Sequence, residues 1–113
     1  DKNDYNEIIN ETKKIINITI NNKSYFASIK PYGNAEFFGI AINGKTPELR
    51  EKYFIITQMT LFLNNYCQKW VDNIISSKAS FVNDVLQYSL NGINFREIAE
   101  YYIDEVKKEM EVV

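Results

Sequence analysis

One stretch of the sequence, from Thr46 to Ser77, limits the possible folds more than any other. Its apolar residues recur at alternating steps of four and three, a spacing that places them on one stripe of an α-helix. This stripe consists of Leu49, Tyr53, Ile56, Thr60, Leu63, Cys67, Trp70 and Ile74. A second stripe beside it consists of Ile55, Met59, Phe62 and Tyr66. Because two adjacent apolar stripes have to be covered from at least two sides, the pattern predicts a central helix surrounded by other elements or by a second chain.

The ends of this helix raise a question of length. Thr46, Pro47 and Glu48 provide an N-cap hydroxyl, a proline at the first helical position and an acid in the first turn. An unbroken helix to Ser77 would be about 45 Å long, whereas a compact chain of this size has a radius of gyration of about 13 Å. We therefore expect the helix either to break near Asn64-Asn65 or to project and pack against a second copy. A strand over Tyr53–Leu63 is the rival interpretation, because that segment is rich in β-branched and aromatic residues.

The first 45 residues are predicted to be mostly sheet. A short amphipathic helix over residues 4–15 is followed by a change to period-two patterning, which indicates strands. The predicted strands are Ile16–Ile20, Ser24–Lys30 and Ala35–Ile42, joined by turns at Asn21-Asn22-Lys23 and at Pro31-Tyr32-Gly33-Asn34. Gly39 is expected to mark a close backbone approach. The result is a three-stranded antiparallel meander, which has to pack on a helix to be stable.

Two further helices are predicted after the central one. Ser80 caps a helix over Phe81–Leu90, and Gly92 ends it in the left-handed conformation. Asn94 then caps the last helix, with Glu97 three residues on as in a capping box. The apolar stripe of this last helix consists of Phe95, Ala99, Tyr102, Val106 and Met110.

Together these elements predict an α+β fold in a single domain covering residues 1–113. Residues 1–45 form the short N-terminal helix and the three-stranded antiparallel meander, and residues 46–113 are helical. The meander is expected to pack on the long central helix and on the two C-terminal helices.

The residue types restrict the chemistry. The sequence contains no histidine and one cysteine, Cys67, which excludes Ser-His and Cys-His nucleophilic pairs, histidine metal sites and a structural zinc cluster within the chain. The four glycines are dispersed, so there is no glycine-rich phosphate loop. A metal site of carboxylates alone, from pairs such as Glu97 and Asp104, is the remaining alternative. We predict a protein that is not an enzyme and that holds no metal or cofactor.

Charge and hydropathy point to an intracellular protein without polyanionic partners. The net charge is −2, and the 13 Lys and Arg residues are scattered, whereas duplex nucleic acid and anionic membranes select dense positive patches. No apolar run is long enough to span a membrane, and the first residues are not signal-like. The richness in Asn, Ile, Lys and Tyr is typical of AT-rich genomes. We expect a cytoplasmic location, in the bacterial host cytoplasm if a phage encodes the chain.

The two arginines, Arg50 and Arg96, each fall in the first turn of a predicted helix. An arginine there opposes the helix dipole, so it either extends into solvent or joins the free N–H groups of the helix start in holding an anion. Near Arg96 in the sequence are Asn91 and Asn94, and Phe81 lies one helix earlier. Aromatic, amide and arginine side chains together would form a nucleotide pocket, although such aromatics more often belong to a core.

Antiparallel strands followed by long helices, the small size, the AT-rich bias and the lack of catalytic residues resemble the phage anti-defence "sponge" proteins. These proteins neutralise Thoeris immunity by sequestering its cyclic ADP-ribose signal. The resemblance concerns the layout of most of the chain. It implies an assembly of identical subunits with ligand pockets of aromatic, amide and arginine side chains near the interface, to which Phe81, Asn91 and Arg96 would contribute.

Two functions are therefore predicted. The first is a non-catalytic binding protein of a phage or mobile element, a homo-oligomer that captures a nucleotide-like signalling ligand at a subunit interface. The alternative is a protein-binding inhibitor or adaptor that acts on a host protein through aromatic residues on the sheet, namely Tyr25, Phe26 and Tyr32.

Overall fold

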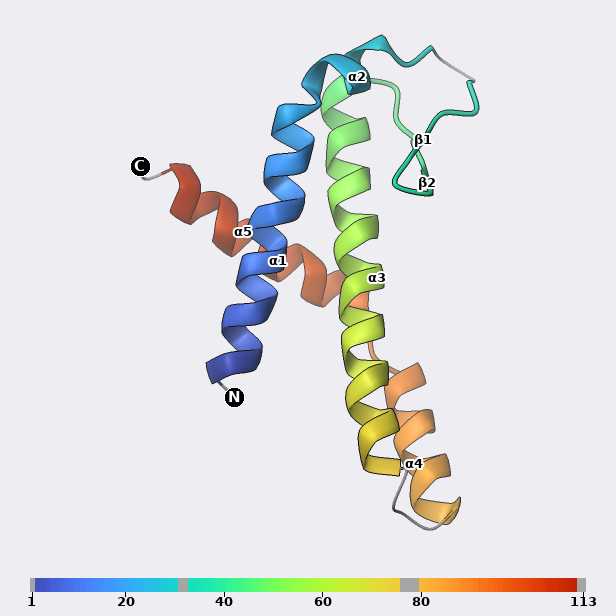
Figure 1. Cartoon of the computed structure of the whole chain (residues 1–113). Helices are drawn as coiled ribbons and strands as arrows, with labels where there is room; N and C mark the ends of the chain where they lie inside the picture. The colour runs from blue at the N-terminus through green and yellow to red at the C-terminus, as the bar shows by residue number, and fades with distance from the viewer. Residues whose placement is uncertain (1, 31–32, 76–79, 112–113) are drawn as a thin grey trace.

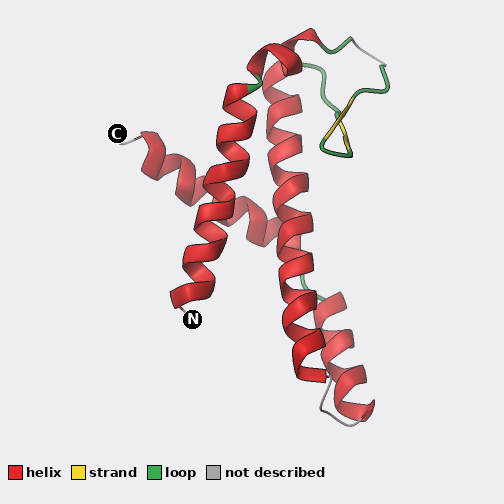
Figure 2. Cartoon of the chain, viewed as in Figure 1, coloured by secondary structure: helices red, strands yellow, loops and turns green. Residues whose placement is uncertain are grey.

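A computed structural model describes residues 2–30, 33–75 and 80–111. The described chain is mostly helical, with one small hairpin at the side of one end of the molecule (Figures 1 and 2). The elements are α1 (Lys2–Asn21), α2 (Lys23–Ser28), β1 (Glu36–Phe37), β2 (Ile40–Ala41), α3 (Pro47–Ile75), α4 (Ser80–Asn91) and α5 (Phe95–Glu111). The predicted turn at Pro31-Tyr32 lies outside the described residues.

The helices are arranged around α3, which contacts α1, α2, α4, α5 and β2. Helices α1 and α3 lie side by side, α5 crosses behind both of them, and α4 folds back along the far end of α3 (Figure 1). The molecule measures 52 × 36 × 18 Å, and its radius of gyration of 16.7 Å exceeds the value of about 13 Å expected for a compact chain of this length. The prediction of a central helix is thus confirmed, in an elongated and thin molecule.

The predicted α+β fold class is wrong, because the first two predicted strands are helical. Helix α1 extends the predicted short helix to Asn21. The period-two reading of Ile16, Ile18 and Ile20 fails, since Ile16 is buried and Ile20 is 47% exposed. The inward stripe instead runs through Thr12 and Thr19, which are buried although polar.

Hydrogen bonds within the helix explain why these threonines are tolerated. The Thr12 hydroxyl donates to the Ile8 carbonyl at 2.7 Å, and the Thr19 hydroxyl donates to the Ile15 carbonyl at 3.0 Å. Because each hydroxyl bonds the carbonyl one turn earlier, burial leaves it satisfied, and the β-branched residues fit the helix. Tertiary packing against α3 thereby overrides the β propensity of the segment.

The other two predicted strands are also replaced. Residues 24–28 belong to α2, which follows α1 after a break at Asn22, where φ is −120°. The predicted strand Ala35–Ile42 is a two-stranded hairpin in which Glu36 pairs with Ala41. Its turn is Phe38-Gly39, with φ of 51° and 75°. Gly39 therefore serves the turn, and a side chain there would meet no atom within 4 Å, so it marks no close approach.

Helix α3 runs unbroken through Asn64-Asn65. The predicted break is therefore wrong, as is the rival strand over residues 53–63, while packing of the long helix against a second copy stays a prediction. At its start the Thr46 hydroxyl accepts a hydrogen bond from the Leu49 N–H at 3.2 Å, as expected for an N-cap. None of the helices in the described ranges combines the length and hydropathy needed to cross a membrane.

The C-terminal helices are close to their predicted ranges. The Asn94 Oδ1 accepts a hydrogen bond from the Glu97 N–H at 3.2 Å, which confirms the predicted cap of α5. Gly92 is not in the left-handed conformation. Instead, the Gly92 and Ile93 N–H groups close the end of α4 with hydrogen bonds to the Ser89 and Leu90 carbonyls, both at 3.2 Å.

An aromatic cluster closes the corner between α2, the hairpin and α3. Phe26 is fully buried, and its ring lies 5.3 Å from the ring of Phe37 and 5.7 Å from that of Phe54. The Tyr25 ring stacks on Phe37 at 5.2 Å, and the Tyr25 hydroxyl donates to the Glu36 carbonyl at 2.7 Å. These contacts anchor a hairpin that is too short to be stable alone.

Tyr66 ties the N-terminal end of α1 to α3. Its hydroxyl donates a hydrogen bond to the Asp4 carboxylate, and the Glu7 carboxylate lies 3.1 Å from the same oxygen. This hydrogen bond lowers the pKa of Asp4 below its usual value of 3.8 and raises the pKa of the Tyr66 hydroxyl. A carboxylate whose pKa is lowered by folding stabilises the fold above its unfolded pKa, and loses that effect as the pH falls through the folded pKa.

The substitution Tyr66→Phe is therefore expected to lower Tm at pH 7, because Asp4 loses the hydrogen bond from the Tyr66 hydroxyl. The difference in Tm between the variant and the original chain should shrink as the pH falls below about 4, where the Asp4 carboxyl becomes protonated in both proteins. Thermal unfolding followed by circular dichroism at several pH values measures this. Tyr101→Phe, at an exposed tyrosine, is the matched control. A difference that stays constant from pH 7 to pH 2 would contradict the role of Asp4.

Candidate functional site

Arg50, one of the predicted anion-binding residues, lies inside the fold. It is only 5% exposed. Its Nε donates to the Gly44 carbonyl at 3.1 Å, and its Nη1 donates to the Phe26 carbonyl at 2.8 Å. The guanidinium thereby joins the start of α3 to α2 and to the loop before α3. Gly44 allows this approach, because its φ is 140° and a Cβ there would lie 2.8 Å from the Arg50 backbone nitrogen.

Arg96 lies on the surface, in agreement with the predicted alternative in which its side chain extends into solvent. Its Nε lies 3.3 Å from the Glu100 carboxylate, one turn further along α5, and both side chains are largely exposed. Asn94 is nearby in its capping role, with its Nδ2 3.5 Å from the Glu97 carboxylate. An exposed pair of this kind contributes little to stability, so the Arg96 guanidinium is accessible to other partners.

The five predicted site residues do not converge within one chain. Phe81 and Asn91 stand at opposite ends of α4, ten residues apart, which corresponds to about 15 Å along the helix axis. Phe81 is 77% exposed at the end of α4 far from Arg96, and Arg50 is buried at the other end of α3. Only Asn91, Asn94 and Arg96 are close in the chain, at the junction of α4 and α5. Capture of a nucleotide-like ligand between subunits stays a prediction.

The aromatic surface predicted for protein binding is not formed as expected. Phe26 is fully buried, and Tyr25 is half-buried with its hydroxyl bonded to Glu36. Tyr32 lies outside the described residues. The ring that the hairpin does expose is that of Phe38, at 63%.

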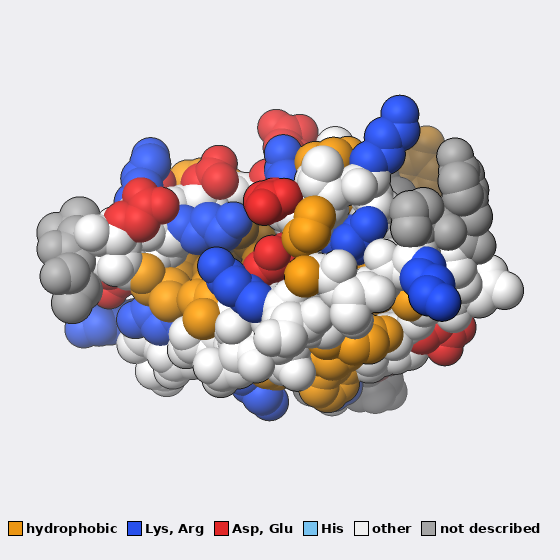
Figure 3. All heavy atoms as spheres, turned by 90° about the horizontal axis from the view of Figure 1, so that it is seen from above, with side chains coloured by type: hydrophobic (Ala, Val, Ile, Leu, Met, Phe, Trp, Pro, Cys, Tyr) orange, Lys and Arg blue, Asp and Glu red, His pale blue; other side chains and the backbone are white. Residues whose placement is uncertain are grey.

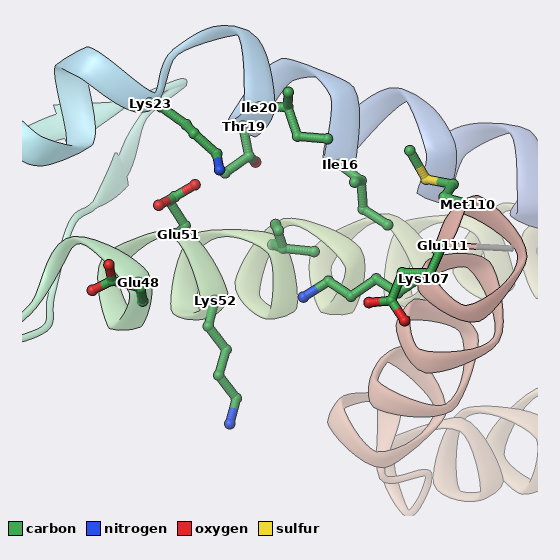
Figure 4. Close-up of a pocket in the computed structure, with 11 residues that line it drawn as sticks. Ile16, Thr19, Ile20, Lys23, Glu48, Glu51, Lys52, Lys107, Met110 and Glu111 are labelled. Carbon is green, nitrogen blue, oxygen red and sulfur yellow. The ribbon is translucent and has the colours of Figure 1, made fainter. Parts of the chain in front are cut away.

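A groove with a volume of about 470 Å³ lies between α1, α3 and α5 (Figure 4). Its apolar surface is supplied by Ile16 and Ile20 of α1, Ile55 of α3 and Met110 of α5. Ile16 and Ile55 are buried, while Ile20 is 47% exposed and presents its side chain to the groove. The groove exists because α5 crosses α1 and α3 and leaves their upper halves uncovered on that side.

Six charged side chains surround this apolar surface. The cations are Lys23, Lys52 and Lys107, and the anions are Glu48, Glu51 and Glu111. Within the described parts of the chain, none of the six forms an ion pair or a side-chain hydrogen bond. Figure 4 shows Lys107 extending from α5 toward α3, whereas Lys52 points away from the cavity. The charges are therefore available to an external partner.

A second groove of about 380 Å³ continues on the other side of Lys107. It shares Glu48, Lys52 and Ile55 with the first groove and adds Glu100 and Asp104 of α5. Charges of both signs also alternate on the face seen in Figure 3, with apolar side chains between them. This surface lacks the dense positive patch that a polyanion selects.

The chemistry of the main groove is that of a binding surface. The side chains that line it among the described residues include neither an aromatic ring nor an arginine, so no base could stack there as in a nucleotide pocket. The described residues contain no cluster of three or more potential metal ligands. Sequence reasoning missed this site because its lining comes from three helices, of which the relevant half of α1 was read as a strand.

Comparisons of the chain with protein-family models, with curated proteins and with solved structures find no match. The resemblance to the anti-defence sponge proteins therefore stays a prediction. Function has to be argued from the residues of this chain and from their arrangement.

The contrast between the two arginines can be measured. We expect Arg50→Ala to lower the free energy of unfolding by about 3 kcal/mol, because two inward-facing carbonyls lose a charged donor. Arg96→Ala, the matched control, should change it by less than about 0.5 kcal/mol. Urea denaturation followed by circular dichroism gives both values. Equal effects of the two substitutions would show that the Arg50 guanidinium does not hold the corner together.

Proposed function

We propose that the protein is a non-catalytic protein-binding inhibitor or adaptor, and that the groove between α1, α3 and α5 holds an amphipathic helix of its partner. The observation that carries the proposal is an apolar surface bordered by charges of both signs, none of which forms an ion pair within the described residues. A protein-binding inhibitor or adaptor was the alternative function predicted from the sequence. The proposed contact surface is now the groove and not the aromatic residues Tyr25, Phe26 and Tyr32.

The shape of the groove supports a helical occupant. Helix-in-groove recognition uses an apolar stripe on the partner helix, with residues three and four apart entering a hydrophobic groove. The groove provides exposed Ile20 together with Met110 as the apolar contacts. Its volume of about 470 Å³ lies within the usual range of ligand-binding clefts, and its open side allows a chain to lie across it.

The charges restrict what kind of partner fits. An anionic small molecule or nucleic acid attracted by Lys23 and Lys107 would also meet Glu48, Glu51 and Glu111. A polypeptide helix with acidic and basic residues on the flanks of its apolar stripe can satisfy both signs at once. Charge complementarity of this kind fixes the register of a partner and excludes wrong partners more than it adds affinity.

Exposed Ile20 makes the proposal testable without damaging the core. Ile20→Asp puts a charge on the apolar surface of the groove, and Ile98→Asp is the matched control at an isoleucine that is 37% exposed on α5. We expect the original chain and Ile98→Asp to capture the same stoichiometric protein from extracts of the cells in which the chain is made. Ile20→Asp should capture at least tenfold less.

A photo-crosslinking residue in place of Ile20 identifies the bound segment. We expect it to couple to an amphipathic helical stretch of the captured protein, and the same residue in place of Ile98 should not. Equal capture by the two aspartate variants, or equal crosslinking from both positions, would refute the groove as the contact surface. A Tm increase with cyclic nucleotides or ADP-ribose derivatives, without any protein partner, would favour ligand capture instead.

A further inference from the structure

A separate surface, remote from the groove, lies on α4. Phe81, Val85 and Tyr88 are 77%, 48% and 83% exposed, and Val82 beside them is 39% exposed. Residues at positions i, i+4 and i+7 share one face of a helix, so these rings and methyl groups form one apolar stripe. We call Phe81, Val82, Val85 and Tyr88 the α4 patch.

The opposite face of α4 is already used. Leu90 is 5% exposed, and Leu86 is partly buried and packs against the core. Among the described elements, α4 has its substantial contacts with α3. A helix that is apolar on two opposite faces is normally covered on both, and here one face is covered by α3 while the other is open.

The position of α4 makes this opening larger. The end of α1 is fixed near Tyr66 by the contact with Asp4, and α3 continues beyond it to Ile75 with α4 alongside (Figure 1). The α3–α4 hairpin thus projects from the rest of the molecule as two helices. The face of α4 that is turned away from α3 is therefore open along the length of the helix.

The size of the α4 patch suits a dimer. A large aromatic side chain presents about 150–250 Å², so at these exposures the patch offers roughly 400 Å² of apolar surface per chain. Two copies would bury roughly 800 Å² of apolar area. Because homodimer interfaces are about 65% apolar, the total comes to roughly 1,200 Å², above the threshold of about 1,000 Å² for a specific interface.

The charge of α4 favours a second copy over a membrane. Residues 80–91 contain no lysine or arginine, and Asp84 is their single charged residue. Anionic lipid surfaces attract basic helices, so α4 lacks the positive charge that would bind it to them. Two identical copies bring only one like-charge pair together, and an antiparallel two-fold arrangement leaves Asp84 at the rim.

We propose that the α4 patch is the interface of a homodimer, in which the two α4 helices pack antiparallel on each other and each α3 lies on the outer side of its own α4. A two-fold axis near Val85 places Phe81 of each chain against Tyr88 of the other and brings the two Val85 side chains together. The interface is isologous and closes after two copies. It leaves the groove between α1, α3 and α5 free, so the dimer and the proposed function stand independently.

The mass of the full chain in solution tests the dimer. Light scattering and sedimentation equilibrium should give twice the chain mass of 13.3 kDa. The double variant Phe81→Asp/Tyr88→Asp should give a single chain mass with unchanged helical circular dichroism. The matched control Tyr101→Asp, at a tyrosine that is 58% exposed on α5, should remain dimeric. A single chain mass for the original protein, or a dimer that survives the double substitution, would overturn the proposal.

A crosslink tests the geometry. In a Cys67→Ala background, Val85→Cys should form an interchain disulfide quickly under mild oxidation, because the two-fold axis brings the residue opposite its own copy. Tyr101→Cys in the same background should form at least tenfold less interchain disulfide in the same time. Equal rates at the two positions would overturn the antiparallel arrangement even if the mass were that of a dimer.

Discussion

Burial of the apolar residues of α3 is the interaction on which the other elements depend. Phe54, Ile55, Ile56, Met59 and Leu63 are almost completely covered. No single neighbour can cover them, because they occupy more than one side of the helix. Helix α1 packs on one side, α5 crosses another, and α2 with the hairpin closes the N-terminal end. Beyond the end of α1, the described element that covers α3 is α4. The other elements thus pack along one helix, and apolar surface stays exposed where these elements end.

The sequence predicted the elements whose signals are local. The N-caps Thr46 and Asn94 mark the starts of α3 and α5, and both form the expected hydrogen bonds. The prediction failed at residues 16–30, where alternating isoleucines imitate a strand and the inward positions are held by threonine. It also failed in register near the end of α3, where Val71 is buried and Trp70 is 58% exposed, since helical spacing does not specify where a covering helix ends.

The candidate site was harder to predict than the fold. Arg50 was predicted to bind an anion because its charge opposes the helix dipole. Its actual partners are backbone carbonyls, and no sequence pattern indicates which carbonyls will lie near a side chain. The charges of the groove come from α1, α3 and α5, and only the crossing of α5 brings them together. Single charged residues on helices look like ordinary solvated faces. The exposed face of α4 was not predicted either: the helical spacing suggested that Val82 and Val85 face inward with Leu86 and Leu90, but both valines are exposed, because spacing alone does not reveal which of two apolar faces is covered.

The thickness of 18 Å has a consequence for how such a molecule can work. Helices pack with their axes about 8–10 Å apart, so this dimension accommodates only two layers. A slab of two layers has no interior large enough to enclose another molecule and shield it from water. A partner of this protein therefore binds on its surface and stays partly exposed to solvent. Selectivity then comes from complementary shape and charge along an extended surface contact, and not from the size of an enclosed cavity.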